Sequence, residues 1–248
     1  MNPYESDKLL SEYLLFHYGN EESIFGDLPG PSYALNFAAR LVNELIDPAI
    51  VPSGAKALEI GCAVGRSAYE LTKYVRSVEA LDFSHRFIEA ANALKLTGSL
   101  STKIAVEGEV TADFVATVPS TLRRNAVSFF QGDATDLPRD LADFDVVLAA
   151  NLICRLPDPQ PFISRLPSLV KPGGQLLLTT PFTWLEEFTP KANWIGGTEE
   201  ARSFPALEKL LSPHFELSLK KDLPFVIREH SRKFQYSVAL GSRWIRRA

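Results

Sequence analysis

The residues that point most directly to chemistry lie in one stretch, 56–69, which reads KALEIGCAVGRSAY. Its apolar start, 57–60, is predicted to be a buried strand, and 66–74 is predicted to be a helix. Gly61 and Gly65 bracket the turn between them. A strand that ends in a glycine turn and continues as a helix presents backbone N–H groups at the helix N-terminus. The stretch is therefore predicted to be a ligand cradle.

Further candidate binding residues follow the ends of the later predicted strands. In an open parallel sheet, ligands bind beyond the carboxyl ends of the strands, where the strand order reverses. The residues at these positions, together with those of the cradle, are Glu59, Gly61, Asp82, Asp133, Asn151, Thr180 and Trp184. The identity of the ligand has to come from finer features of the pattern.

The elements that position these residues alternate between strand and helix. Strands are predicted at 57–60, 78–81, 127–131, 144–149 and 175–180, and helices at 66–74, 84–96 and 161–169. A helix near 200–211 and strands near 215–220 and 233–240 follow. Because the strands are almost continuously apolar, the fold class is α/β, with a mostly parallel twisted sheet and helices on both faces.

We expect one domain, with residues 51–248 as its core. Residues 1–50 are predicted to be an N-terminal helical cap, because apolar and aromatic residues recur there at helical spacing. A second helix of the cap is predicted from about 33 to 46. Residues 98–125 interrupt the alternation as an insertion that contains a possible hairpin, 103–106 with 110–112.

Composition and charge exclude several classes of function. The chain has 248 residues, a net charge of -4 and 46% hydrophobic residues, which gives no reason to expect nucleic acid or an anionic membrane as a partner. Its two cysteines, Cys62 and Cys154, have no metal-binding spacing, so no metal is expected and a reducing cytoplasm fits. No signal peptide is recognised, and no apolar run reaches the roughly 20 residues that span a bilayer.

A dinucleotide-dependent dehydrogenase is the first alternative for the cradle. Its fingerprint, G-x-G-x-x-G, needs a third glycine for close packing of helix on strand. With Gly61 as the first glycine, Ala63 is the second and Arg66 takes the third position. An arginine cannot replace that glycine, so the sequence argues against a dinucleotide.

From about residue 55 to 180, the chain resembles the class I S-adenosylmethionine-dependent methyltransferases, which have a Rossmann-like fold. The matching motifs are LEIGCAVG at 58–65, Asp82 at the end of the next strand, GDA at 132–134, ANL at 150–152 and KPGG at 171–174. Their order and spacing carry the resemblance, since each motif alone is weak. The chain departs from the family in having Ala63 at the middle glycine and a long insertion at 98–125.

The resemblance implies S-adenosylmethionine as cofactor and S-adenosylhomocysteine as product. It implies that Asp82 accepts hydrogen bonds from the ribose hydroxyls, Phe83 lies against the adenine and Asp133 accepts from the adenine amino group. The methionine part would be held by Glu59 and the backbone of 61–65. The complete implied cofactor set is Glu59, Gly61, Cys62, Ala63, Gly65, Asp82, Phe83, Ser84, Asp133, Ala134 and Asn151.

The flanking segments resemble a narrower family, the methyltransferases of ovothiol biosynthesis. The phrases that carry this resemblance are YESDKLLSEYLLFHYG at 4–19, RLPDP at 155–159, TWLEE at 183–187 and LPFVIRE at 223–229. It implies methylation of an imidazole nitrogen of 4-mercaptohistidine (5-thiohistidine), giving ovothiol A. Many members are fused to an iron-dependent sulfoxide synthase, so a separate sulfoxide synthase is the expected functional partner here.

Residues for the acceptor are assigned from this resemblance and from side-chain chemistry. A forked guanidinium suits the carboxylate of an amino acid, which makes Arg155 and Arg228 candidates. The predicted catalytic residues are Asn151, Arg155, His17 and Tyr18, and the predicted substrate-binding residues are Tyr13, Trp184, Glu186 and Arg228. Two alternatives stay open: another small-molecule acceptor, and a non-enzymatic cofactor-binding partner of an iron sulfoxide synthase.

Overall fold

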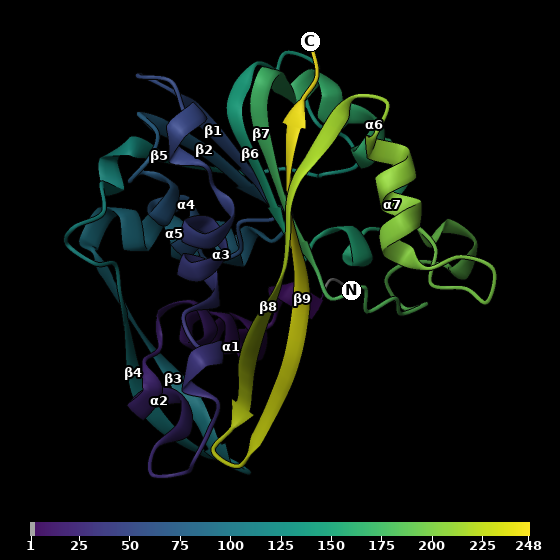
Figure 1. Ribbon diagram of the computed structural model, residues 1–248. Coiled ribbons are helices and arrows are strands. Elements are labelled where there is room, and N and C mark those ends of the chain that lie inside the picture. Colours follow the sequence, from purple (N-terminus) through teal and green to yellow (C-terminus); the bar gives the residue numbers. More distant parts are fainter. Residues whose placement is uncertain (1–2) are drawn as a thin grey trace.

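The computed structural model describes residues 3–248 and is built around one seven-stranded sheet (Figure 1). The strand order is β5-β2-β1-β6-β7-β9-β8. The strands are β1 (Lys56–Ile60), β2 (Ser77–Asp82), β5 (Val127–Gln131), β6 (Phe144–Ala150), β7 (Val170–Thr180), β8 (Phe215–His230) and β9 (Lys233–Arg246). The first five are parallel, and β9 is antiparallel to both β7 and β8. The expected α/β fold class, with a mostly parallel Rossmann-like sheet, is confirmed.

Helices cover both faces of this sheet, as the apolar strands require. One face packs against α3 (Phe37–Leu45), α4 (Arg66–Leu71) and α5 (His85–Thr97). The other packs against α6 (Pro159–Leu169) and α7 (Ser203–Leu211). Alternate strand residues divide between the two cores: Ala57 faces the first and Leu58 the second.

A cap extends from the carboxyl ends of the parallel strands, at the bottom of Figure 1. We define it as α1 (Asp7–Tyr18), α2 (Glu21–Phe25), the hairpin of β3 (Ser99–Glu107) and β4 (Val110–Thr117), and the distal part of the β8–β9 hairpin, 224–237. These segments, with Ala34 and Leu35 from the loop after α2, share a third small core, whose other members are Leu15, Ile24, Phe25, Ile104 and Val226. The cap is thus assembled from three separate parts of the sequence.

This cap differs in extent from the one expected at 1–50. Helix α3 lies within 1–50 but packs on the main sheet, and the inserted hairpin joins the cap. The last two strands are also much longer than the predicted 215–220 and 233–240. Pro224 obscured the length of β8, because proline cannot donate to a strand ladder. It is accommodated here in an edge strand, where its carbonyl accepts from the Arg40 guanidinium at 2.8 Å.

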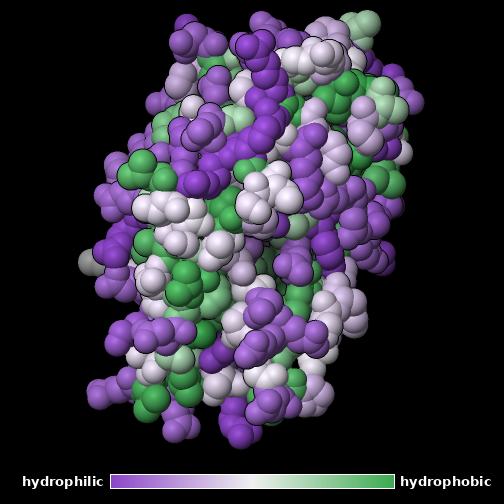
Figure 2. Space-filling view, turned by 90° about the vertical axis from the view of Figure 1, so that its left-hand side faces the viewer, coloured by the Kyte–Doolittle hydropathy of each residue, from purple (hydrophilic) through white to green (hydrophobic). Residues whose placement is uncertain are grey.

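The surface shows no sign of a single large apolar face in the view of Figure 2, where apolar residues are scattered among polar ones. Exposed apolar side chains include Leu96 on α5, and Val110 and Val115 on β4. None of the helices within residues 3–248 has the length and apolar character needed to cross a bilayer.

The shared core of the cap gives a stability prediction. Leu15 is 2% exposed, and its replacement by alanine leaves a cavity where α1 meets the other cap segments. We expect Leu15→Ala to lower the free energy of unfolding by about 2–5 kcal/mol in urea denaturation. Leu96→Ala, at an α5 position that is 83% exposed, is the control. Its expected change is within about 0.5 kcal/mol, and an equal loss in both variants would contradict the assigned core.

Candidate active site

A cavity of about 560 Å³ lies between the carboxyl ends of the parallel strands and the cap. This volume is typical of a small-molecule site. Its floor is made by the ends of β1, β2, β5 and β6, and the strand order reverses at β1, between β2 and β6. Its roof is made by α1 and the β8–β9 hairpin. The position is the one that an open parallel sheet offers to a ligand.

The loop after β1 has the tight geometry expected of a cradle. Gly61, Ala63 and Gly65 have φ values of 79°, 45° and 84°. A Cβ at Gly65 would come within 2.6 Å of the Phe129 ring, so glycine is required there for both its dihedral angle and its space. The turn is closed by the Gly65 N–H, which donates to the Cys62 carbonyl at 2.9 Å. Gly61 and Ala63 line the cavity.

Asp82 fixes this loop from the neighbouring strand. Its carboxylate accepts from the Ala63 N–H at 2.8 Å and from the Ser84 N–H at 2.9 Å. Burial raises the pKa of Asp82 to about 6, although these two backbone donors oppose the shift. Asp82 lines the cavity, whereas Cys62, Gly65 and Ser84 support its walls from behind.

Glu59 is the most deeply buried carboxyl group of the site, with 1% of its surface exposed. One of its oxygens accepts from the Ser67 hydroxyl, and the other, Oε2, has no hydrogen-bond partner among residues 3–248. Burial, with a smaller contribution from the nearby Asp82, raises the pKa of Glu59 to about 8. A buried oxygen without a partner calls for a donor from elsewhere, and a cationic ligand group in the cavity fits this need.

The ends of β2 and β5 contribute further residues to the floor of the cavity. Phe83 lines the cavity and is 55% exposed, which leaves a ring face open to a planar ligand. The Asp133 carboxylate accepts from the Thr135 N–H at 2.8 Å and from its hydroxyl at 2.7 Å. Asp133 and Ala134 both line the cavity, as does Asn151 at the end of β6. The Asn151 side chain accepts from the Thr179 hydroxyl at 2.9 Å.

The wall formed by the segment after β6 contains one permanent cation, Arg155. Its Nη1 donates to the carbonyls of Cys154 and Thr183, both at 3.0 Å, and its guanidinium lies 4.8 Å from the centre of the Phe188 ring. Of the cavity-lining residues that the structure describes, Arg155 is the only arginine or lysine, and no ion pair neutralises it. This wall therefore suits an anionic group of a ligand.

Tyr13 and His17, both on α1, line the roof of the cavity. Burial raises the pKa of the Tyr13 phenol and lowers the pKa of His17 to about 3, so both are neutral at pH 7. The His17 Nδ1 is buried without a hydrogen-bond partner in the described part of the chain. Neither side chain is a strong base in this setting.

Besides Cys62, Gly65 and Ser84 of the predicted cofactor set, four of the predicted catalytic and substrate-binding residues lie outside the cavity lining: Tyr18, Trp184, Glu186 and Arg228. The Trp184 indole donates to the Ser203 hydroxyl at 2.9 Å, and Glu186 is exposed on the surface. The Arg228 guanidinium is used within the cap, where it donates to the carbonyls of Ser23 and Ala105 at 2.6 and 3.1 Å. Of the two candidate arginines, the structure therefore places only Arg155 at the cavity.

Several cavity residues escaped the sequence analysis. They are Tyr4, Phe16, Phe37, Ser67, Phe87, Phe188, Phe225 and Ile227. Most are apolar residues that look like ordinary core positions, and only the folding of the cap brings them to the cavity. Ser67 is the exception, since its place in the first helical turn after the cradle was a usable signal. No group of three or more potential metal ligands occurs within residues 3–248.

The raised pKa of Glu59 predicts how stability depends on pH. The ordinary carboxyl pKa is 4.5 and the folded value is about 8, so between them the folded protein holds a proton that the unfolded chain has lost. Stability must then fall as pH rises through this range, by at most about 1.4 kcal/mol per pH unit from this group. Urea denaturation of Glu59→Gln should show a flatter pH dependence between roughly pH 5.5 and 7.5. Exposed Glu186→Gln should keep the wild-type slope, and an unchanged slope in Glu59→Gln would refute the assignment.

Comparisons with known sequences agree with this geometry. A family described as "Methyltransferase domain" matches residues 32–219. The ubiquinone biosynthesis O-methyltransferase of Xanthomonas axonopodis pv. citri (strain 306) is 24% identical over 155 residues, covering 62% of this chain and 54% of that protein. The protein of the same name from Coxiella burnetii (strain Dugway 5J108-111) is 24% identical over 137 residues, covering 55% and 48%. The chain spans about half the length of these curated relatives.

Solved structures share the fold at low sequence identity. The [4+2]-cyclase SpnF covers 99% of this chain and 94% of its own, with a TM-score of 0.62 and 16% identity. The N-methyltransferase NodS from Bradyrhizobium japonicum WM9, in complex with S-adenosylhomocysteine, covers 84% and 83%, with a TM-score of 0.50 and 14% identity. The family match covers most of the chain, so the expected reaction class is confirmed. The chain belongs to the methyltransferase domain family.

Proposed function

We propose that the protein transfers a methyl group from S-adenosylmethionine to an imidazole ring nitrogen of 4-mercaptohistidine, giving ovothiol A. The resemblance of the flanking segments names this acceptor. The structural observation that supports it is Arg155, a guanidinium that lines the cavity and forms no ion pair with the described residues, although it donates to two backbone carbonyls. An amino acid acceptor brings a carboxylate to meet that charge. We also propose that a separate iron-dependent sulfoxide synthase takes part in forming the acceptor before the methyl group is transferred.

The cofactor is proposed to lie along the floor of the cavity. Asp82 would accept from the ribose hydroxyls, and Phe83 would lie against the adenine, with Asp133 and the Ala134 N–H at its polar edge. Glu59 would face the methionine ammonium, which supplies the donor that its buried Oε2 lacks. Ligand-free Asp82 and Glu59 have raised pKa values because of burial, and a cationic cofactor favours their ionised forms.

The acceptor is proposed to bind between Arg155 and α1. Arg155 would hold the carboxylate, while Tyr13 and His17 would lie against the imidazole ring, and Asn151 would stand at the junction with the cofactor. A bidentate arginine fixes the direction of the amino acid. Such orientation is what decides whether a ring nitrogen or the more nucleophilic sulfur faces the methyl group.

Methyl transfer to this acceptor needs positioning more than base catalysis. When bound, S-adenosylmethionine supplies the methyl carbon, and its sulfur takes back the electron pair as the nitrogen–carbon bond forms. An imidazole nitrogen with a pKa near 6.5 is mostly unprotonated at pH 7, and the ring proton left after transfer can pass to water. Among the described residues that line the roof, His17 has a pKa of about 3 and Tyr13 a raised one, so neither provides a strong base. Holding the reactants about 3 Å apart supplies most of the acceleration.

An O-methyltransferase acting on a quinol is the second candidate. The curated relatives are named ubiquinone biosynthesis O-methyltransferases, and a quinol is the acceptor that this name suggests to us. One part of the cavity is apolar, lined by Phe37, Leu41 and Phe225, and fits an apolar substituent better than an amino acid. Against this candidate, a neutral quinol leaves the Arg155 charge without a partner, and a phenol needs a base to become nucleophilic.

The cofactor assignment is tested by Asp82→Ala. We expect the affinity for S-adenosylmethionine to fall by more than about tenfold in calorimetry, because two hydrogen bonds to a charged group are lost together. Asp140→Ala, at an exposed position, is the control and should bind as the wild type does. Unchanged affinity in Asp82→Ala would remove Asp82 from the cofactor site.

The acceptor assignment is tested with labelled cofactor and two acceptors, 4-mercaptohistidine and a catechol-type quinol. We expect an N-methyl product from the first, identified by NMR. Arg155→Gln should raise its KM by about tenfold or more, with little change in the KM of the cofactor. Arg228→Gln is the comparison, with a smaller expected effect on KM because its guanidinium serves the cap. Methylation of the quinol alone, or a larger effect of Arg228→Gln, would contradict the proposal.

A further inference from the structure

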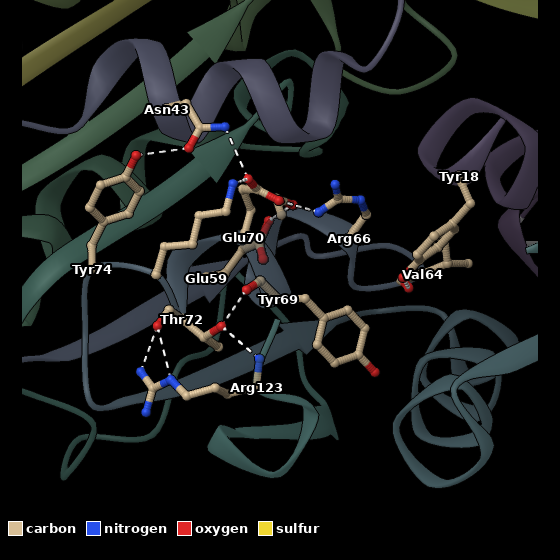
Figure 3. A network of polar contacts seen from close by, with 12 residues as sticks. Tyr18, Asn43, Glu59, Val64, Arg66, Tyr69, Glu70, Thr72, Tyr74 and Arg123 are labelled. Atoms are coloured by element: carbon tan, nitrogen blue, oxygen red, sulfur yellow. Dashed lines mark hydrogen bonds and ion pairs between the residues drawn. The ribbon is translucent and has the colours of Figure 1, made fainter. Parts of the chain in front are cut away.

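Helix α1 is attached to the two loops that form the floor of the cavity. At its C-terminal end, the Tyr18 hydroxyl donates to the Val64 carbonyl at 2.9 Å, in the loop after β1 (Figure 3). Just before its N-terminal end, the Tyr4 carbonyl accepts from the Ser84 hydroxyl at 2.9 Å, in the loop after β2. The helix therefore spans both loops, while its own side chains Tyr13 and His17 line the roof of the cavity.

Of the two loops that α1 contacts, the loop after β1 has the more unusual backbone conformation. Val64 lies between Ala63 and Gly65, which both have positive φ, at 45° and 84°. On one side of Val64, the Ala63 N–H donates to Asp82, and on the other side the Val64 carbonyl accepts from Tyr18. A non-glycine residue at positive φ persists only where its surroundings hold it. Tyr18 is the contact from the cap that holds this turn.

We propose that the Tyr18 hydroxyl is a positioning group that couples cofactor binding to the docking of α1 over the cavity. A cofactor bound to the turn at 61–65 stabilises the conformation in which the Val64 carbonyl meets Tyr18. By linkage, a docked α1 must then strengthen cofactor binding by the same factor. Cofactor binding thereby favours the docked position of α1, whose Tyr13 and His17 line the cavity. This inference uses the cofactor, not the identity of the acceptor.

The chain offers a matched control in Tyr74. Its hydroxyl donates to the Asn43 side chain at 2.8 Å, and Asn43 in turn donates to Glu70 at 3.0 Å (Figure 3). This contact joins α3 to the turn after α4, and Tyr74 does not line the cavity. Tyr18→Phe and Tyr74→Phe each remove one hydroxyl and one hydrogen bond, so a loss of affinity from general destabilisation would affect both.

The experiment measures the Kd of S-adenosylhomocysteine by calorimetry, with no acceptor present. We expect Tyr18→Phe to raise the Kd by about three- to tenfold, as for one neutral hydrogen bond, and Tyr74→Phe to change it by less than about twofold. In parallel, hydrogen exchange is followed across 7–18. The ligand should slow exchange there in the wild type and in Tyr74→Phe, and much less in Tyr18→Phe.

Two results would overturn the inference. One is an equal Kd in the two variants. The other is full ligand protection of 7–18 in Tyr18→Phe, which would show that α1 responds without the hydroxyl. Urea denaturation of both variants checks that they are folded to the same extent. Since no acceptor is used, failure here leaves the assignment of 4-mercaptohistidine standing, and failure of the acceptor assay leaves this coupling standing.

Discussion

The structure depends on the Asp82 carboxylate, which joins the two loops that a ligand must contact. Its oxygens accept from the Ala63 and Ser84 backbone, so the turn after β1 and the start of α5 are held at fixed separation. Burial makes this carboxyl group costly to ionise, as the pKa of about 6 indicates. A ligand that adds further donors to Asp82 removes part of that cost. The Asp82 carboxylate therefore holds the loop after β1 in place without a ligand, and it also favours binding of a ligand that donates hydrogen bonds.

The cavity lining carries charged groups of both signs, and each sign suits a different ligand group. Three carboxyl groups, Glu59, Asp82 and Asp133, and one guanidinium, Arg155, line the cavity. A sulfonium cofactor with an ammonium group complements the first set, and an acceptor with a carboxylate complements the second. The cap contributes aromatic side chains to the cavity, and the described cap residues that line it include no strong base. We expect such a site to select its ligands by charge and to select the methylated atom by the orientation of the acceptor.

Much of the fold could be predicted because it depends on local pattern. Strand–helix alternation predicts the mostly parallel sheet. Gly61, Gly65 and Asp82 predict the edge of the sheet at which a ligand binds. The cap could not be predicted in the same way, because its core joins α1, an inserted hairpin and the end of β8, which lie far apart in the sequence. For the same reason Arg155 and Arg228 looked equivalent, although only one reaches the cavity. The contact of the Tyr18 hydroxyl with the Val64 carbonyl could not be predicted either, because helical spacing does not show which group a side chain meets in another part of the chain.

A crystal structure with S-adenosylhomocysteine and 4-mercaptohistidine bound together would show both proposed sets of contacts at once. We expect the ribose hydroxyls on Asp82, the acceptor carboxylate on Arg155, and an imidazole nitrogen, not the sulfur, facing the position of the transferred methyl. An acceptor carboxylate on Arg228 or on the surface, or a ribose away from Asp82, would contradict the proposed contacts.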